Sequence, residues 1–109
     1  MTTDRFGLSQ ATVDKIRAVF AAHPEVERAL LYGSRAKGNH RNGSDIDLTL
    51  HGPSLTDRIL MDLLGELDDL LLPHTIDLSI FSALHHPGLE EHIQRVGQVF
   101  YERPGDTAR

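Results

Sequence analysis

The most informative absences in this 109-residue chain are cysteine, long apolar runs and an excess of positive charge. Without cysteine, disulfides and thiolate metal sites are excluded. No apolar run approaches the roughly 20 residues that a bilayer span needs, and the N-terminus lacks the basic-then-apolar pattern of a signal peptide. These absences predict a soluble, cytoplasmic protein that does not associate with a membrane.

The charge balance argues against a nucleic-acid-binding protein. The chain has 16 acidic residues and 11 Lys and Arg residues, for a formal net charge of −5. Non-specific binding to nucleic acid requires Lys and Arg side chains that neutralise phosphates, so no direct nucleic-acid contact is expected. The local exception is a basic cluster formed by Arg35, Lys37, His40 and Arg41.

Length and composition favour a single domain over residues 1–109, with residues 103–109 as a loose C-terminal tail. Hydrophobic residues make up 39% of the chain and charged residues 25%, as in globular proteins. Short elements that alternate in type predict the order α-β-(turn)-β-α-β-α-β. We therefore expect an α/β (α+β) fold in which helices pack on a small, mixed, four-stranded sheet.

Local signals place the individual elements. Expected helices run from about 10 to 22, 55 to 71 and 89 to 96, and expected strands cover 26–32, 45–50, 75–81 and 98–101. Ser9 is expected to cap the first helix and Ser54, with Asp57 three residues later, the second. The second helix has an apolar face wider than one sheet needs, which leaves a protein-interaction role open.

Two aspartates lie one residue apart in the expected strand "DIDLTL". Alternation puts Asp45 and Asp47 on the same face, roughly 6.5–7 Å apart at the backbone. Carboxylates that converge from there repel each other and raise each other's pKa unless a cation neutralises them. Magnesium prefers oxygen ligands of this kind, and two ions about 3.5–4 Å apart serve phosphoryl transfer. The alternative for the pair alone is an ordinary solvated strand face.

Two further features extend this candidate site. If the strand "IDLSI" pairs beside "DIDLTL", Asp77 joins the same cluster and is positioned to accept a proton from an attacking hydroxyl. Upstream, Gly33-Ser34 stands at an expected strand-to-helix turn, where backbone N–H groups attract phosphate. Arg35 and Lys37 follow directly and are candidates for neutralising a triphosphate.

The spacing of these residues resembles a known family. Gly33-Ser34, ten residues and then Asp45-Ile46-Asp47 are similar to the signature of the DNA polymerase beta-like nucleotidyltransferase superfamily. The segments "LLYGSRAKG", "SDIDLTL", "IDLSI" and "HIQRVGQVFYE" resemble its minimal nucleotidyltransferase (MNT) branch in order and spacing. The likeness covers roughly residues 9 to 102.

The resemblance implies a role for each candidate residue. Asp45, Asp47 and Asp77 would be catalytic and would bind two Mg²⁺ ions, and Gly33 and Ser34 would hold the phosphates of ATP. MNT proteins are typically encoded beside a helical HEPN partner, which in several pairs is a toxin RNase. In those pairs, the MNT protein is an antitoxin that transfers AMP to a tyrosine of the toxin, which implies a type VII-like toxin–antitoxin pair here.

Two alternatives stay open at this stage. One is an antitoxin that neutralises its partner by binding alone, without catalysis. The other is a nucleotidyltransferase that acts on a small-molecule acceptor. The four strands and three main helices are used in building one sheet and its cover, which leaves no second domain to shape an acceptor pocket, so an acceptor on another chain is favoured.

Overall fold

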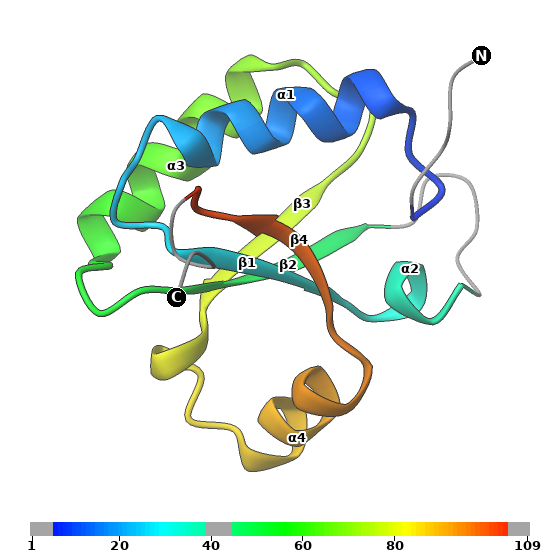
Figure 1. The fold of residues 1–109 in the computed structure, drawn as a ribbon, viewed down its shortest axis with the longest axis vertical. Coiled ribbons are helices and arrows are strands. Elements are labelled where there is room, and N and C mark those ends of the chain that lie inside the picture. The colour runs from blue at the N-terminus through cyan, green and yellow to red at the C-terminus, as the bar shows by residue number, and fades with distance from the viewer. Residues whose placement is uncertain (1–5, 39–44, 105–109) are drawn as a thin grey trace.

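A mixed four-stranded sheet organises the chain, which a computed structural model describes over residues 6–38 and 45–104 (Figure 1). Its strands are β1 (Arg28–Tyr32), β2 (Ile46–His51), β3 (Ile76–Ile80) and β4 (Gln98–Glu102). The helices are α1 (Gln10–Ala21), α2 (Ser34–Lys37), α3 (Asp57–Asp69) and α4 (Pro87–Val96), and a 3-10 turn covers Phe81–Ala83.

The strands lie in the order β3-β2-β1-β4. β1 is antiparallel to both of its neighbours, β2 and β4, whereas β2 and β3 are parallel and are connected through α3. A parallel pair requires a crossover of this kind, because the chain must return to the same end of the sheet before the next strand begins. The predicted mixed, four-stranded sheet is therefore confirmed.

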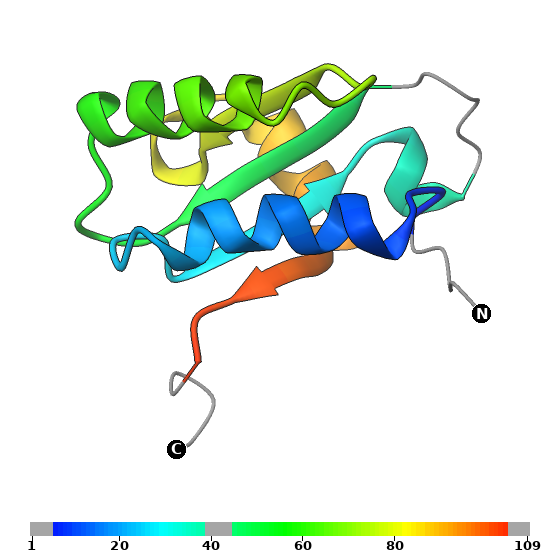
Figure 2. The ribbon, with the colours of Figure 1, turned by 90° about the horizontal axis from the view of Figure 1, so that it is seen from above.

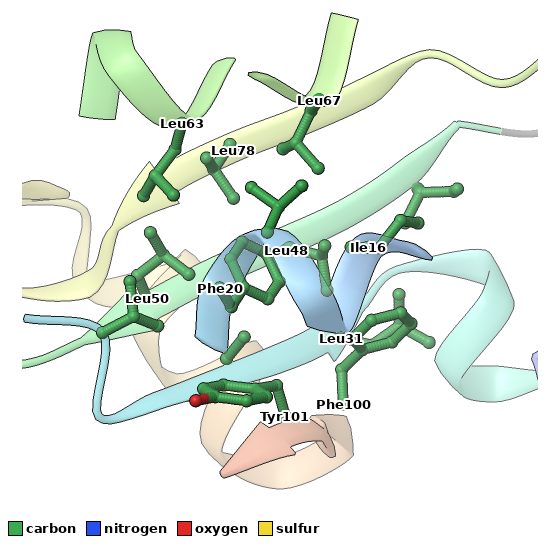
Figure 3. Packing of buried hydrophobic residues seen from close by; sticks show 14 of the residues in the cluster. Ile16, Phe20, Leu31, Leu48, Leu50, Leu63, Leu67, Leu78, Phe100 and Tyr101 are labelled. Carbon is green, nitrogen blue, oxygen red and sulfur yellow. The ribbon is translucent and has the colours of Figure 1, made fainter. Parts of the chain in front are cut away.

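The core lies between the sheet and the helix pair α1 and α3, which run side by side over one face (Figure 2). Leu31, Leu48 and Leu78 from three neighbouring strands meet Phe20 of α1 and Leu63 of α3 there (Figure 3). α4 lies on the opposite side of the sheet (Figure 1). No helix in these two described stretches is long and apolar enough to cross a membrane.

The helix starts show where local reasoning succeeded. The Ser9 side chain accepts a hydrogen bond from the Thr12 N–H at 3.2 Å, which confirms the predicted cap of α1. The prediction that Ser54 caps α3 is wrong: the cap is Thr56, which accepts from the Ile59 N–H at 3.2 Å. A turn closed by the Leu55 N–H and the Gly52 carbonyl holds Ser54 ahead of the helix start.

α4 begins two residues earlier than its apolar pattern indicated. The imidazole Nδ1 of His86 accepts a hydrogen bond from the Leu89 N–H at 3.0 Å and thereby caps the helix. Pro87 occupies the first helical position, where its missing N–H and its restricted φ are favourable. Gly97 ends the helix, as predicted.

The strand pairing continues slightly beyond β4. The Arg103 N–H donates to the Glu27 carbonyl at 2.9 Å, and its guanidinium donates to the Pro24 carbonyl at 2.7 Å. Arg103 opens the segment predicted as a loose tail, so this first residue is held by the fold. Residues 105–109 of that tail lie outside the described residues.

The C-terminal end of α3 has an unusual residue. Leu71 follows the last helical turn with φ of 54°, the left-handed conformation in which glycine is normally found. Its side chain is 87% exposed, so it gains little burial in return. A left-handed conformation costs a non-glycine residue about 1–2 kcal/mol.

Replacing Leu71 by glycine is therefore expected to raise the free energy of unfolding by about 1 kcal/mol. Denaturation in urea measures this change. Met61→Gly is the opposite control: Met61 is also exposed, but it lies within α3, where glycine destabilises by about 1 kcal/mol. A loss of stability in the Leu71→Gly variant would contradict the assignment of strain to this position.

A second prediction concerns His51 at the end of β2. Its ring stacks on Phe81 with centroids 4.7 Å apart, and its buried Nε2 has no hydrogen-bond partner among the described residues. Burial, and to a lesser degree the charge of Arg28, lowers the pKa of His51 below its ordinary value of 6.5. As the pH falls, His51 is therefore protonated in the unfolded chain before it is protonated in the folded chain. His51 does not lower the free energy of unfolding above about pH 6.5, but it lowers it increasingly at lower pH.

The His51→Phe variant keeps a ring against Phe81 and removes the titration. Its free energy of unfolding should fall less than that of the wild type between about pH 7 and pH 5. Urea denaturation at a series of pH values measures the two slopes. His74, whose pKa is also lowered by burial, titrates in both proteins and cancels in the comparison. Equal slopes would show that His51 does not titrate differently in the folded state.

Candidate functional site

Three strands bring polar side chains to one row on the sheet face opposite the α1–α3 core. Asp47 on β2 is directly paired with Asp77 on parallel β3 and with Tyr32 on antiparallel β1. Paired residues of neighbouring strands share a face, and the strands lie about 4.8 Å apart. Asp45 directly precedes β2 and is exposed. The strand pairing on which the predicted role of Asp77 depended is therefore present.

The electrostatics of this row are unfavourable as it stands. Burial is the largest cause that raises the pKa of Asp47, and the charges of Asp77 and then Asp45 raise it further. The pKa of Tyr32 is also raised, mainly by burial and then by Asp77. None of the three aspartates forms an ion pair with a described Lys, Arg or His. Negative charge thus accumulates at one place, and no Lys, Arg or His among residues 6–38 and 45–104 pairs with it.

The turn after β1 lies directly against Asp47. Gly33 has φ of 78°, and a Cβ at this position would collide with Oδ2 of Asp47. Glycine is therefore required twice, for its backbone conformation and for the close approach of the carboxylate. Ser34 begins the short helix α2 at the same turn and is half-buried. The structure thus places the Gly33-Ser34 turn beside Asp47, as expected from the sequence for a single site.

Arg35 and Lys37 are placed differently from each other. The guanidinium of Arg35 donates to the Phe6 carbonyl at 2.9 Å and lies 3.5 Å from Nδ1 of His74, and only 3% of the residue is exposed. Arg35 thereby links α2 to the N-terminal segment and to the loop before β3. Lys37 is exposed. Phosphate binding by Arg35 and Lys37 stays a prediction, and His40 and Arg41 lie outside the described residues.

The donor set fits a hard cation in part. Magnesium commonly takes one or two protein carboxylates and completes its shell with water and substrate phosphates. Asp47 and Asp77, in register on neighbouring strands, supply such a pair. Within residues 6–38 and 45–104, however, no three His, Cys, Asp or Glu side chains lie close enough together to hold an ion. Asp45 therefore adds charge to the site without completing a three-carboxylate cluster in this conformation.

Sequence reasoning overlooked a row of hydroxyl groups that lies next to the carboxylates on the same face of the sheet. Ser79 donates to Thr49 Oγ1 at 3.0 Å and also shares a side-chain hydrogen bond with Tyr32. Thr49 and Ser79 each follow a site aspartate by two residues, so strand alternation places them on the same face. Tyr32 directly precedes Gly33. Its position opposite Asp47 depends on the register of β1 and β2, which no local pattern reveals.

These features define a class of protein. A mixed sheet with paired carboxylates on one face, beside a glycine turn, is suited to metal-assisted phosphoryl chemistry. Residues 14–106 match the family model described as polymerase beta, nucleotidyltransferase. The chain therefore belongs to the polymerase beta nucleotidyltransferase family, and the resemblance stated from its sequence is confirmed. Comparison with curated proteins finds no match.

Solved structures share the fold. A toxin–antitoxin with AMP-PNP has a TM-score of 0.68 and 21% identity, over 86% of this chain and 76% of that chain. A mutant of the toxin–antitoxin MntA–HpeT has a TM-score of 0.66 and 20% identity, over 86% and 75%. The toxin–antitoxin MntA–HepT has a TM-score of 0.63 and 19% identity, over 85% and 72%. At these identities the likeness shows a shared fold.

The charge accumulation leads to a prediction for Asp47. In a buffer without divalent ions, Asp47→Asn should raise the free energy of unfolding by up to about 1 kcal/mol, because like charges paired across strands destabilise a sheet. Added Mg²⁺ should stabilise the wild type but not the variant, because a ligand stabilises only a fold that binds it. Thermal unfolding with and without Mg²⁺ measures both effects.

Asp14→Asn is the matched control, because Asp14 is exposed on α1 and distant from β2 and β3 in the sequence. It should leave the response to Mg²⁺ unchanged. An Asp47→Asn variant that is less stable than the wild type in the ion-free buffer would show that Asp47 does not carry an uncompensated charge.

Proposed function

We propose that this chain is a Mg²⁺-dependent nucleotidyltransferase that transfers AMP from ATP to a tyrosine hydroxyl of a HEPN-type toxin. In this proposal it is the antitoxin of a type VII-like pair, and both proteins act in the cytoplasm. The family and the shared fold support nucleotidyl transfer, and the relatives named as toxin–antitoxin structures support the biological role. The AMP-PNP in one of them supports ATP as the donor.

The observation that carries the proposal is the pairing of Asp47 with Asp77, beside a glycine turn that touches Asp47. A sheet gains nothing in stability from two unpaired carboxylates in register. The arrangement becomes favourable when positive charge and a substrate phosphate are added. Bound Mg²⁺ would supply that charge and would polarise the phosphate oxygens.

The residues of this chain have distinct parts in the proposed reaction. Gly33 and Ser34 hold the β- and γ-phosphates through backbone N–H groups and the serine hydroxyl. Asp45, Asp47 and Asp77 would be ligands of Mg²⁺, and Asp77 would also take the proton of the acceptor hydroxyl. The acceptor oxygen forms a bond to the α-phosphorus of ATP, the bond from that phosphorus to the β-phosphate oxygen breaks, and pyrophosphate leaves.

The acceptor is expected on another chain. All four strands in the described residues belong to one sheet, and α1, α3 and α4 cover its faces. The described residues form this one sheet with its covering helices and contain no second domain that would shape an acceptor pocket. A protein partner that brings its own tyrosine to the row of carboxylates meets this requirement.

Neutralisation by binding alone is the second candidate. It is favoured by the absence, among the described residues, of three side chains that are placed to hold an ion without rearrangement. A protein of this kind would protect the cell without using ATP.

Incubation with α-labelled ATP, Mg²⁺ and the product of the neighbouring gene tests the proposal. We expect labelled AMP on a tyrosine of the neighbour. Transfer should fall at least a hundredfold in Asp77→Asn, as for loss of a group that acts in proton transfer, and in Asp47→Asn, which removes a metal ligand. Asp14→Asn is the control and should transfer normally.

Absence of label, with cell protection that persists in the Asp45→Asn, Asp47→Asn double variant, would reject the enzyme in favour of the binding protein. Label on a small hydroxylated compound instead of the neighbour would reject the protein acceptor.

A further inference from the structure

A groove with both apolar and polar lining residues lies beside the C-terminal end of α3, on the other side of β3 from the carboxylates. It has a volume of about 620 Å³ and is open to solvent. Its apolar lining consists of Leu64, Leu67, Leu71, Leu72, Pro73 and Ile76. Ile76 faces the groove, whereas the next residue, Asp77, faces the candidate site, because successive residues of a strand point to opposite faces. The groove and the site thus share the same end of β3.

Leu71 makes this groove costly for the isolated chain. It combines a left-handed backbone conformation, which disfavours leucine, with a side chain that is 87% exposed. Glycine would relieve the first cost, and a polar residue would relieve the second. Leu71 lines the groove together with Leu67 and Leu72, and a contiguous apolar patch of this kind is where binding of another molecule is expected.

The electrostatics beside the groove point to a positively charged occupant. Asp68 and Asp69 lie in the last turn of α3, where the helix dipole is negative and basic residues are normally favoured. Neither carboxylate forms an ion pair with any described residue. Asp68 lines the groove, and Asp69 lines the shallow depression next to it. Cationic side chains of a partner would neutralise both carboxylates and the end of the helix together.

We propose that this groove is a docking surface for a basic amphipathic segment of a protein partner. An apolar side chain of that segment would cover Leu71, and Lys or Arg residues flanking it would pair with Asp68 and Asp69. A second copy of this chain fits poorly, because its net charge of −5 would bring like charges together. Nucleic acid is repelled for the same reason.

The groove is also linked to the candidate site. His74 lines it, and Nδ1 of His74 lies 3.5 Å from the guanidinium of Arg35 on α2. α2 begins directly after Gly33, which touches Asp47. A partner seated in the groove would therefore be held at the end of the sheet where the acceptor must arrive. This placement rests on the proposed function, but docking itself is measured without ATP.

The test uses the ¹⁵N-labelled full chain and three helical peptides of about 18 residues, a length that allows a helix to form on binding. One peptide has Leu on one face and Lys on the other, the second has Leu and Glu, and the third has Ser and Lys. We expect the Leu/Lys peptide alone to bind, with the largest amide shifts at Leu71, Leu72 and Ile76.

Variants separate docking from folding. Leu71→Gly is expected to weaken binding of the Leu/Lys peptide about tenfold, as for the loss of a central apolar anchor, although it stabilises the fold. Asp68→Asn with Asp69→Asn should weaken binding and reduce its dependence on salt. Asp14→Asn with Glu91→Gln removes the same charge from exposed positions on α1 and α4 and is expected to leave binding unchanged.

Several results would overturn the docking surface. They are shifts confined to another face, equal binding of the Leu/Glu peptide, no effect of Leu71→Gly, and no binding at about 1 mM peptide. Shifts at the groove that depend on protein concentration alone would assign it to a second copy and also reject the proposal. Peptide docking without AMP transfer to the neighbour would support the docking surface and reject the proposed enzymatic activity. AMP transfer without peptide docking would support the enzymatic activity and reject the docking surface.

Discussion

The parallel pairing of β2 with β3 is the constraint on which both the core and the site depend. Its register places Leu48 beside Leu78 on one face and Asp47 beside Asp77 on the other. The leucines are covered by α1 and α3, so the burial of apolar surface holds the carboxylates together against their repulsion. A shift of one residue would expose the leucines and bury the aspartates. The hydrophobic core therefore enforces a site that is unfavourable by itself.

Unfavourable features are concentrated at one end of this small sheet. Gly33 bends against the carboxylate of Asp47, the carboxylates around Asp47 have no ion-pair partner in the part of the chain that the structure describes, and α3 ends in aspartates followed by a left-handed leucine. Elsewhere α1 begins with a serine cap, and most of the buried positions are apolar. Local conflict within a consistent fold is typical of functional regions, and these three features lie near the site and the groove.

Local signals were reliable where a feature depends on neighbours in the sequence. Ser9, Gly97 and the alternation of Leu48 with Asp47 were assigned correctly because caps, breaks and strand faces are decided within a few residues. The same rules misplaced the start of α3, because a turn at Gly52 selects Thr56 over Ser54. They also missed the cap of α4, because a histidine seldom serves in that role.

The sequence alone was enough to identify the candidate carboxylates, the glycine turn and the family. The residues of the family motif lie close together in the sequence at a fixed spacing, and side chains alternate along a strand with a fixed period. Tertiary structure decided which strands are neighbours, and with that the pairing of Asp77 with Asp47 and the position of Tyr32. It also decided that Arg35 is buried against Phe6 and that Leu71 is exposed beside two unpaired aspartates. These outcomes depend on contacts between residues far apart in the chain, which no local periodicity encodes.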